Sequence, residues 1–211
     1  MQSAEKPPAT NEFSEKEKRA EWHLNDLGLT FEDLREKAVL DVGAGAAEIA
    51  GAGKEKGISG IISMDLHPEI WQENGAKLPD VPYVKADASK MPFEDSSFDM
   101  IISHGGPINI LDDKKTVRKV VREFVRVLKD GGEARFGVGS LSAKLLKMED
   151  PSSFQGTPRE KALILESRKK SLEFLKKIYP NIEICDIEGE SGMGYHDATY
   201  FVLKKPAKTK K

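Results

Sequence analysis

Short apolar segments alternate along this chain with longer segments in which apolar residues recur at helical spacing. Seven of the short segments have the length and the residue content of buried strands. They are residues 38–42, 60–64, 83–86, 98–103, 133–138, 182–187 and 199–203. Alternation of strands with helices is typical of a parallel sheet that is covered by helices on both faces. The pattern therefore predicts a three-layer α/β domain with a mostly parallel sheet.

The helical segments carry recognisable start and stop signals. Ser14 and Glu17 form a capping box that predicts the start of the first helix, and Gly28 predicts its end in a left-handed conformation. Residues 113–128 are amphipathic, with apolar side chains on one face and lysine and arginine on the other. Further helices are expected at residues 30–34, 46–56, 68–74 and 157–178.

Composition narrows the class of protein. The 211 residues, 38% hydrophobic and 32% charged, suit a single globular domain. The sequence shows no apolar run near the ~20 residues of a membrane helix and no secretory signal. A single cysteine, Cys185, excludes an internal disulfide framework and fits a reducing compartment. We therefore expect a cytoplasmic protein without a membrane partner, and the net charge of −2 argues against DNA as a partner.

The most informative stretch is the turn that follows the first predicted strand. Asp41, Gly43 and Gly45 stand there in the pattern acid-x-Gly-x-Gly, just before a predicted helix. Glycines allow unusual backbone angles and let a ligand lie against bare backbone, so we count Ala44, between them, as a ligand contact too. The dinucleotide fingerprint fails here because its last small position is Glu48.

This turn resembles the first motif of the class I S-adenosylmethionine-dependent methyltransferases, acid-x-Gly-x-Gly-x-Gly, with Ala47 in place of the third glycine. Asp65 lies about 20 residues beyond Gly45 at the tip of the next predicted strand, where an acid can bond two ribose hydroxyls. Leu66 follows at a place where the family often packs a side chain on adenine. Taken singly, a glycine turn fits other α/β domains, and an aspartate at a strand end fits an ordinary turn.

A second resemblance begins at Asp87, where the chain is similar to D-A-x-x-L-P-F-x-D-x-S-F-D of small-molecule methyltransferases of type 11. It implies that Asp87 accepts the adenine amino group and that the Ala88 N–H meets adenine N1, an acceptor and a donor side by side. Together the motifs imply a Rossmann-like methyltransferase fold with a seven-stranded sheet and an antiparallel last strand. The implied cofactor is S-adenosyl-L-methionine, with S-adenosyl-L-homocysteine as product.

The strand predicted at 98–103 ends at Ser103, and His104 and two glycines follow. Ligands of open α/β sheets bind beyond the carboxyl ends of the strands, so this loop is the candidate acceptor side, and Ser103 and His104 join the expected cofactor contacts. His104 is the candidate general base, because imidazole titrates near pH 6.5. The alternative is a structural histidine held by a hydrogen bond. No metal site is predicted.

We therefore expect methyl transfer to an O, N, S or C atom of a small molecule by in-line displacement. Two alternatives stay open, a protein or RNA acceptor and a module that binds the cofactor without turnover. The sequence has neither the Asn-Pro-Pro-Tyr nor the Pro-Cys motif of DNA-modifying enzymes, and Glu48 disfavours a nicotinamide oxidoreductase. The acceptor, the atom methylated and the oligomeric state, monomer or homodimer, are left open.

The chain divides into four parts. Residues 1–12 are expected to be a flexible leader, 13–36 an N-terminal helical cap or lid, 37–205 the methyltransferase domain and 206–211 a basic tail. The resemblance implies a lid over cofactor and acceptor, whereas the plainer alternative is a helix packed on the edge of the domain. Apolar residues within 140–156 are expected to line an acceptor pocket or to cover the sheet.

Overall fold

The computed structural model describes residues 10–75, 77–110, 113–137, 166, 169–186 and 199–208. Several expectations lie outside these residues. They are the leader up to residue 9, the apolar stretch 140–156, the start of the helix predicted at 157, the loop 187–198 and the last three residues of the tail.

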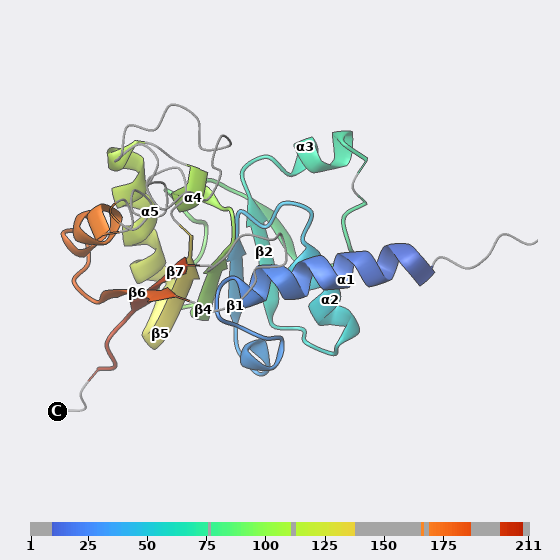
Figure 1. Cartoon of the computed structure of the whole chain (residues 1–211), viewed down its shortest axis with the longest axis horizontal. Helices are drawn as coiled ribbons and strands as arrows, with labels where there is room; N and C mark the ends of the chain where they lie inside the picture. The colour runs from blue at the N-terminus through green and yellow to red at the C-terminus, as the bar shows by residue number, and fades with distance from the viewer. Residues whose placement is uncertain are drawn as a thin grey trace, which may run out of the picture.

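A seven-stranded sheet forms the centre of the molecule (Figure 1). The strands lie in the order β3-β2-β1-β4-β5-β7-β6. β7 runs antiparallel to both of its neighbours, and the other adjacent pairs are parallel. The predicted Rossmann-like sheet with an antiparallel last strand is therefore confirmed. The strands are β1 (Val39–Val42), β2 (Ile61–Asp65), β3 (Tyr83–Lys85), β4 (Phe98–Ser103), β5 (Leu128–Phe136), β6 (Ile182–Asp186) and β7 (Thr199–Lys204).

Successive residues of the central strands pack against helices on opposite faces of the sheet. In β1, Val39 joins one apolar core and Leu40 the other, and in β4 Ile102 and Ile101 divide in the same way. α1 (Thr10–Asn25) and α2 (Glu48–Glu55) cover the first face. α5 (Lys114–Val127) and the helical residues 169–176 cover the second (Figure 1). This alternation produces the predicted three layers, because adjacent side chains of a strand point to opposite faces.

The carboxyl ends of the parallel strands meet at one edge of the sheet. The loop after β1, α3 (Pro68–Glu73) after β2 and α4 (Pro107–Ile110) after β4 lie at this edge (Figure 1). The short 3-10 helix η1 (Glu32–Leu34) precedes β1 at the opposite edge. The sequence pattern does not predict α4. None of the helices among the described residues is long and apolar enough to cross a membrane.

Two predicted boundaries are wrong. α1 begins at Thr10, so the capping box at Ser14 lies inside the helix instead of starting it. β5 begins at Leu128, five residues before the predicted start, because Leu128 pairs with Phe98 across a register shift in the ladder with β4. Gly131 and Gly132, which taken locally indicate a turn, are therefore part of the strand. Gly28, in contrast, adopts the predicted left-handed conformation just past α1, with φ of 64°.

Candidate functional site

The loop after β1 is held against two neighbouring strand ends. The N–H groups of Gly43 and Ala44 donate to the Met64 carbonyl oxygen over 2.8 and 3.1 Å. Gly43 and Gly45 have φ of 77° and 55°, in the region that favours glycine. A Cβ atom on Gly43 would lie 2.5 Å from Cα of Gly106, in the loop after β4. Glycine at position 43 is therefore what lets the two loops touch.

Asp65, the last residue of β2, faces this glycine loop. The Gly45 N–H donates to its Oδ2 over 3.1 Å, and the His67 N–H donates to its Oδ1 over 2.9 Å. The Tyr83 hydroxyl donates to the Gly45 carbonyl oxygen over 2.7 Å. Each carboxylate oxygen has a free lone pair beyond these bonds, so Asp65 can still accept from a ligand. The structure thus brings together the glycine and the acid that the sequence places 20 residues apart.

Asp41 lies in β1 just before the loop and is only 3% exposed. Burial, with the nearby Asp65 carboxylate as a second cause, raises the pKa of Asp41 to about 7. No residue that the structure describes donates a hydrogen bond to its carboxyl group. A buried acid without a cationic or donor partner disfavours its own charged form, so a positive charge brought close to it would lower its pKa.

The remaining predicted residues reach the same edge from other strands. Asp87 follows β3, is exposed, and accepts the Ser89 N–H on Oδ1 over 2.7 Å. Ala88 beside it is buried, while Leu66 is 48% exposed. Ser103, at the end of β4, is buried and donates its hydroxyl to the Val42 carbonyl oxygen over 2.8 Å. The predicted set therefore gathers at the carboxyl ends of β1, β2, β3 and β4.

His104 contacts the N-terminal helix instead of standing free. Its Nε2 lies 3.0 Å from Oδ2 of Asp26, just past the end of α1. Its ring stacks on the His23 ring, with centroids 4.4 Å apart and planes inclined by 21°. The Trp22 ring meets it edge-on with centroids 5.0 Å apart. Three side chains from the α1 segment thus surround the candidate base.

His23, the other imidazole of the stacked pair, is partly buried. Burial and the adjacent His104 lower its pKa to about 4, against a smaller opposite effect of Asp26. His23 is therefore neutral at neutral pH. The Nε1 atom of Trp22 is buried and has no hydrogen-bond partner among the described residues.

Sequence reasoning missed these contacts and one more aromatic. The α1 residues lie about 80 positions before His104, and only the packing of α1 over the sheet brings them to it. Trp71 of α3 was also missed, although its indole lies against Gly45 and would be 3.1 Å from a Cβ there. Its signal was available, since Ile70 and Trp71 form an exposed apolar pair on a short helix.

Ala47, in place of the third glycine, adopts φ of 56°, which costs an alanine roughly 1–2 kcal/mol.

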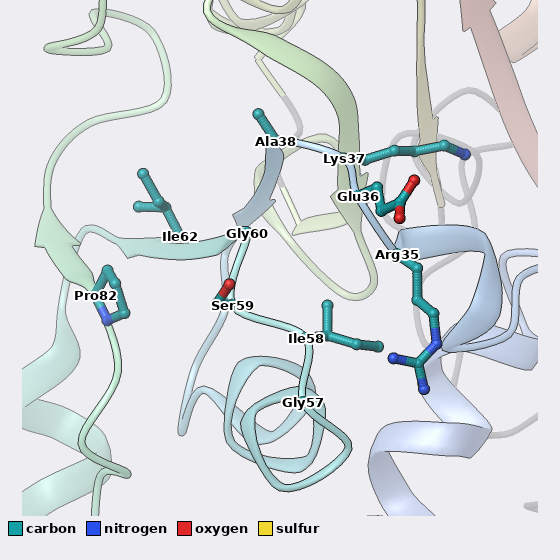
Figure 2. Close-up of a pocket in the computed structure, with 10 residues that line it drawn as sticks. All are labelled: Arg35, Glu36, Lys37, Ala38, Gly57, Ile58, Ser59, Gly60, Ile62 and Pro82. Carbon is teal, nitrogen blue, oxygen red and sulfur yellow. The ribbon is translucent and has the colours of Figure 1, made fainter.

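A pocket of about 660 Å³ lies at the opposite, amino-terminal edge of the sheet (Figure 2). Arg35, Lys37, Ile58 and Pro82 are among the residues that line it. In open α/β sheets the ligands bind at the carboxyl ends of the strands, so this pocket lies on the wrong side for the predicted chemistry. We therefore place the candidate site at the glycine loop.

Comparison with known proteins identifies the family. A family model described as a methyltransferase domain matches residues 40–136. The chain is 33% identical over 101 residues to a demethylmenaquinone methyltransferase of Chlorobaculum tepidum, a match that covers 48% of this chain and 40% of that protein. It thus spans about two-fifths of the length of that curated relative.

Two further matches cover more of the chain. The ubiquinone/menaquinone biosynthesis C-methyltransferase UbiE of Xylella fastidiosa (strain M23) is 30% identical over 177 residues, which covers 76% of this chain and 68% of that protein. A solved structure of a putative S-adenosyl-L-methionine-dependent methyltransferase from Methanococcus maripaludis has a TM-score of 0.58 and 21% identity, with 99% of both chains covered. The likeness to the Methanococcus maripaludis structure shows that the two proteins share a fold.

The family model extends from β1 through β5 and so includes the glycine loop, Asp65 and the His104 loop. The Xylella relative matches over more than two-thirds of its own length. The resemblance found in the motifs alone is thereby confirmed, and the chain belongs to the family of S-adenosylmethionine-dependent methyltransferases.

Proposed function

We propose that this protein transfers the methyl group of S-adenosylmethionine to a small-molecule acceptor at the carboxyl edge of its sheet. The observation that carries the proposal is the approach of the Asp65 carboxylate to the glycine loop, with the Gly45 N–H 3.1 Å from Oδ2. This arrangement offers a carboxylate for two ribose hydroxyls beside backbone that no Cβ blocks.

The other residues at this edge fit the rest of the cofactor. Gly43 lets the loop after β1 lie against the loop after β4, because a Cβ there would meet Gly106 backbone at 2.5 Å, and the Trp71 indole lies against Gly45. Asp87 and the Ala88 N–H supply the acceptor and donor for adenine, and the exposed Leu66 offers it apolar surface. Asp41 receives the cationic amino group of the methionine part, because a buried carboxylate of raised pKa gains most from a nearby positive charge.

When bound, S-adenosylmethionine supplies an activated methyl group, whose bond to sulfur breaks as the bond to the acceptor forms, leaving S-adenosylhomocysteine. The chain's own tasks are to orient the acceptor, to exclude water and to remove a proton where the acceptor carries one. His104, at the end of β4 and partly exposed, is the candidate for the proton transfer. Ser103 fixes the start of its loop through the bond to Val42.

The acceptor class follows from the named relatives. These are methyltransferases of demethylmenaquinone and of ubiquinone and menaquinone biosynthesis. We propose an electron-rich ring with an ionisable hydroxyl as the acceptor, such as reduced demethylmenaquinone. Its hydroxyl proton would pass to His104, and the electron pair left behind would make a ring carbon the nucleophile. After that carbon has gained the methyl group it would lose its own proton to solvent, and the oxygen would regain a proton as the ring becomes aromatic again. The net charge of −2 supports this over a nucleic-acid acceptor.

We also propose that residues 13–36 act as a cap on the domain formed by 37–205. α1 supplies the side chains that surround His104, and Arg19 of α1 pairs with Glu48 at the start of α2 over 2.8 Å. These contacts support a cover over the acceptor side of the site.

The test is methyl transfer from labelled S-adenosylmethionine to reduced demethylmenaquinone, with oxidised demethylmenaquinone, total RNA and denatured protein as parallel acceptors. The proposal predicts label in the reduced quinone alone. Label in RNA or in protein alone would contradict the small-molecule acceptor. Cofactor binding without transfer to any of a broad panel of small molecules would support the non-catalytic alternative.

A further inference from the structure

We propose that Asp26, just past the end of α1, is the positioning residue that fixes the ring orientation and the tautomer of His104. The inference deepens the proposed function and rests on it for the role of His104 as base. It assigns the N-terminal helical segment a part in the proton transfer, beyond that of a cover.

The first support is the geometry of the pair. Oδ2 of Asp26 lies 3.0 Å from Nε2 of His104, within hydrogen-bond distance across 78 residues of sequence. The Asp26 side chain is 17% exposed and the His104 side chain 23% exposed. Both side chains are therefore mostly buried, and their contact is largely shielded from water.

The second support is what a carboxylate does to a neutral imidazole. A carboxylate only accepts hydrogen bonds, so the neutral His104 ring must carry its proton on Nε2 to satisfy Asp26. Its lone pair then resides on Nδ1, which becomes the atom that receives the acceptor's proton. The imidazolium formed in that step donates from Nε2 to a carboxylate that is already in place, and the proton leaves Nδ1 to solvent afterwards.

The third support is the neighbouring imidazole. Two stacked rings 4.4 Å apart cannot both carry a positive charge at low cost. His23 stays neutral at neutral pH because burial and His104 lower its pKa to about 4. Arg19, on the same helix, acts on His23 in the same direction, while Asp26 opposes it. A neutral His23 therefore places no positive charge beside the His104 ring, whose partner is Asp26.

The experiment is a histidine-ring nitrogen NMR spectrum of the full chain, with the four histidines assigned by single substitutions to glutamine. It needs neither cofactor nor acceptor. In the wild type we expect neutral His104 as the Nε2–H tautomer and neutral His23 throughout a titration from about pH 8 to pH 5. In Asp26→Ala we expect loss of the single tautomer, with the unprotonated nitrogen signal of His104 averaged between Nδ1 and Nε2.

Glu21→Ala is the matched control, because it also removes one α1 carboxylate, but one that pairs with Lys56 and not with His104. We expect it to leave the His104 spectrum unchanged. A wild-type His104 in the Nδ1–H form, or an unchanged tautomer in Asp26→Ala, overturns the proposal. If Asp26→Ala does not fold, the wild-type tautomer decides alone.

The readout separates this inference from the proposed function. A wrong tautomer with intact methyl transfer removes Asp26 from the mechanism and leaves the enzyme assignment standing. The predicted tautomer in a chain that transfers no methyl group leaves the pair as a structural clamp between α1 and β4, which also contradicts the positioning role.

Discussion

The two edges of the sheet treat their aspartates in opposite ways. At the amino-terminal edge, Asp99 accepts the Ala38 N–H and pairs with Lys129, each over 2.8 Å. Partial burial works to raise the pKa of Asp99, but these two partners outweigh it and lower the pKa. At the carboxyl edge, Asp41 is fully buried, and burial together with Asp65 raises its pKa to about 7.

This difference between the two edges indicates where the chain gives up stability in order to bind a ligand. At the amino-terminal edge Asp99 has both a donor and a cation as partners within the chain, and a pocket lies beside it (Figure 2). At the carboxyl edge Asp41 is buried without a hydrogen-bond donor or cation among the described residues, and the loop after it has left-handed backbone at three alternate positions, Gly43, Gly45 and Ala47. Strain and unmet polar groups of this kind gather at functional sites, because the ligand and not the protein completes them.

The largest effect that would test this contrast is on turnover. We expect His104→Gln to lower the rate of methyl transfer by about 10²–10⁴-fold, the usual contribution of a general base. Cofactor affinity should stay that of the parent, because the change lies on the acceptor side. Single-turnover kinetics with labelled cofactor measure both. Wild-type turnover in this variant would remove His104 from the mechanism.

The next largest effect is expected at Gly43, where the loop after β1 touches the loop after β4. Gly43→Ala combines a left-handed φ with a Cβ 2.5 Å from Gly106 backbone, so we expect a loss of about 2–4 kcal/mol in the free energy of unfolding and no measurable cofactor binding. Gly57→Ala is the matched control, with φ of 74° and nothing within 4 Å of its Cβ. In Gly57→Ala we expect a loss of about 1–2 kcal/mol in the free energy of unfolding and unchanged cofactor binding. Chemical denaturation measures both losses. Equal losses in the free energy of unfolding at the two positions would show that Gly43 does not lie against Gly106.

The ribose contact should be worth less. We expect Asp65→Ala to weaken cofactor binding by about 1–3 kcal/mol, through the loss of charged hydrogen bonds. Calorimetry measures the change, and Asp80→Ala, which removes a fully exposed acid paired with Lys54 on the surface, serves as control. An unchanged affinity in Asp65→Ala sinks the ribose assignment.

The smallest effects concern the two aspartates themselves. Asp41 binds a proton more tightly in the folded chain, so it costs stability as pH rises from about 4 to about 7, and Asp41→Asn should raise the free energy of unfolding at pH 8 by about 1–2 kcal/mol. Asp99 has a lowered pKa, so its contribution is present above its unfolded value and is lost as pH falls through the folded one. Asp99→Asn should therefore destabilise at pH 8, by about 1 kcal/mol. Urea unfolding measures both changes. A change of the same sign in Asp41→Asn and Asp99→Asn would show that the two edges do not differ in this way.

Local signals were enough to predict much of the fold. β4 has the predicted bounds, Phe98–Ser103, because its four apolar residues form a run that is too short for a helix. β5 was misplaced because Gly131 and Gly132 read locally as a turn, whereas the pairing of Leu128 with Phe98 extends the strand. That pairing is a property of the sheet and has no local signature.

The same division applies to the site. The glycine turn and Asp65 are predictable because chain spacing and strand ends alone bring them together. Asp26 could not be selected, since an acid after a helix is common and its value depends on where the end of α1 meets the loop after β4. The roles of the site residues remain predictions, as does the division of the chain at residue 36.

A cofactor site at the carboxyl edge of the sheet can be tested by calorimetric titration of the full chain with S-adenosylmethionine, S-adenosylhomocysteine and NAD. We expect that both adenosyl compounds bind in roughly the micromolar range, that NAD does not, and that Gly43→Ala abolishes the binding. Absence of adenosyl binding, or binding that survives Gly43→Ala unchanged, would show that the site is not there.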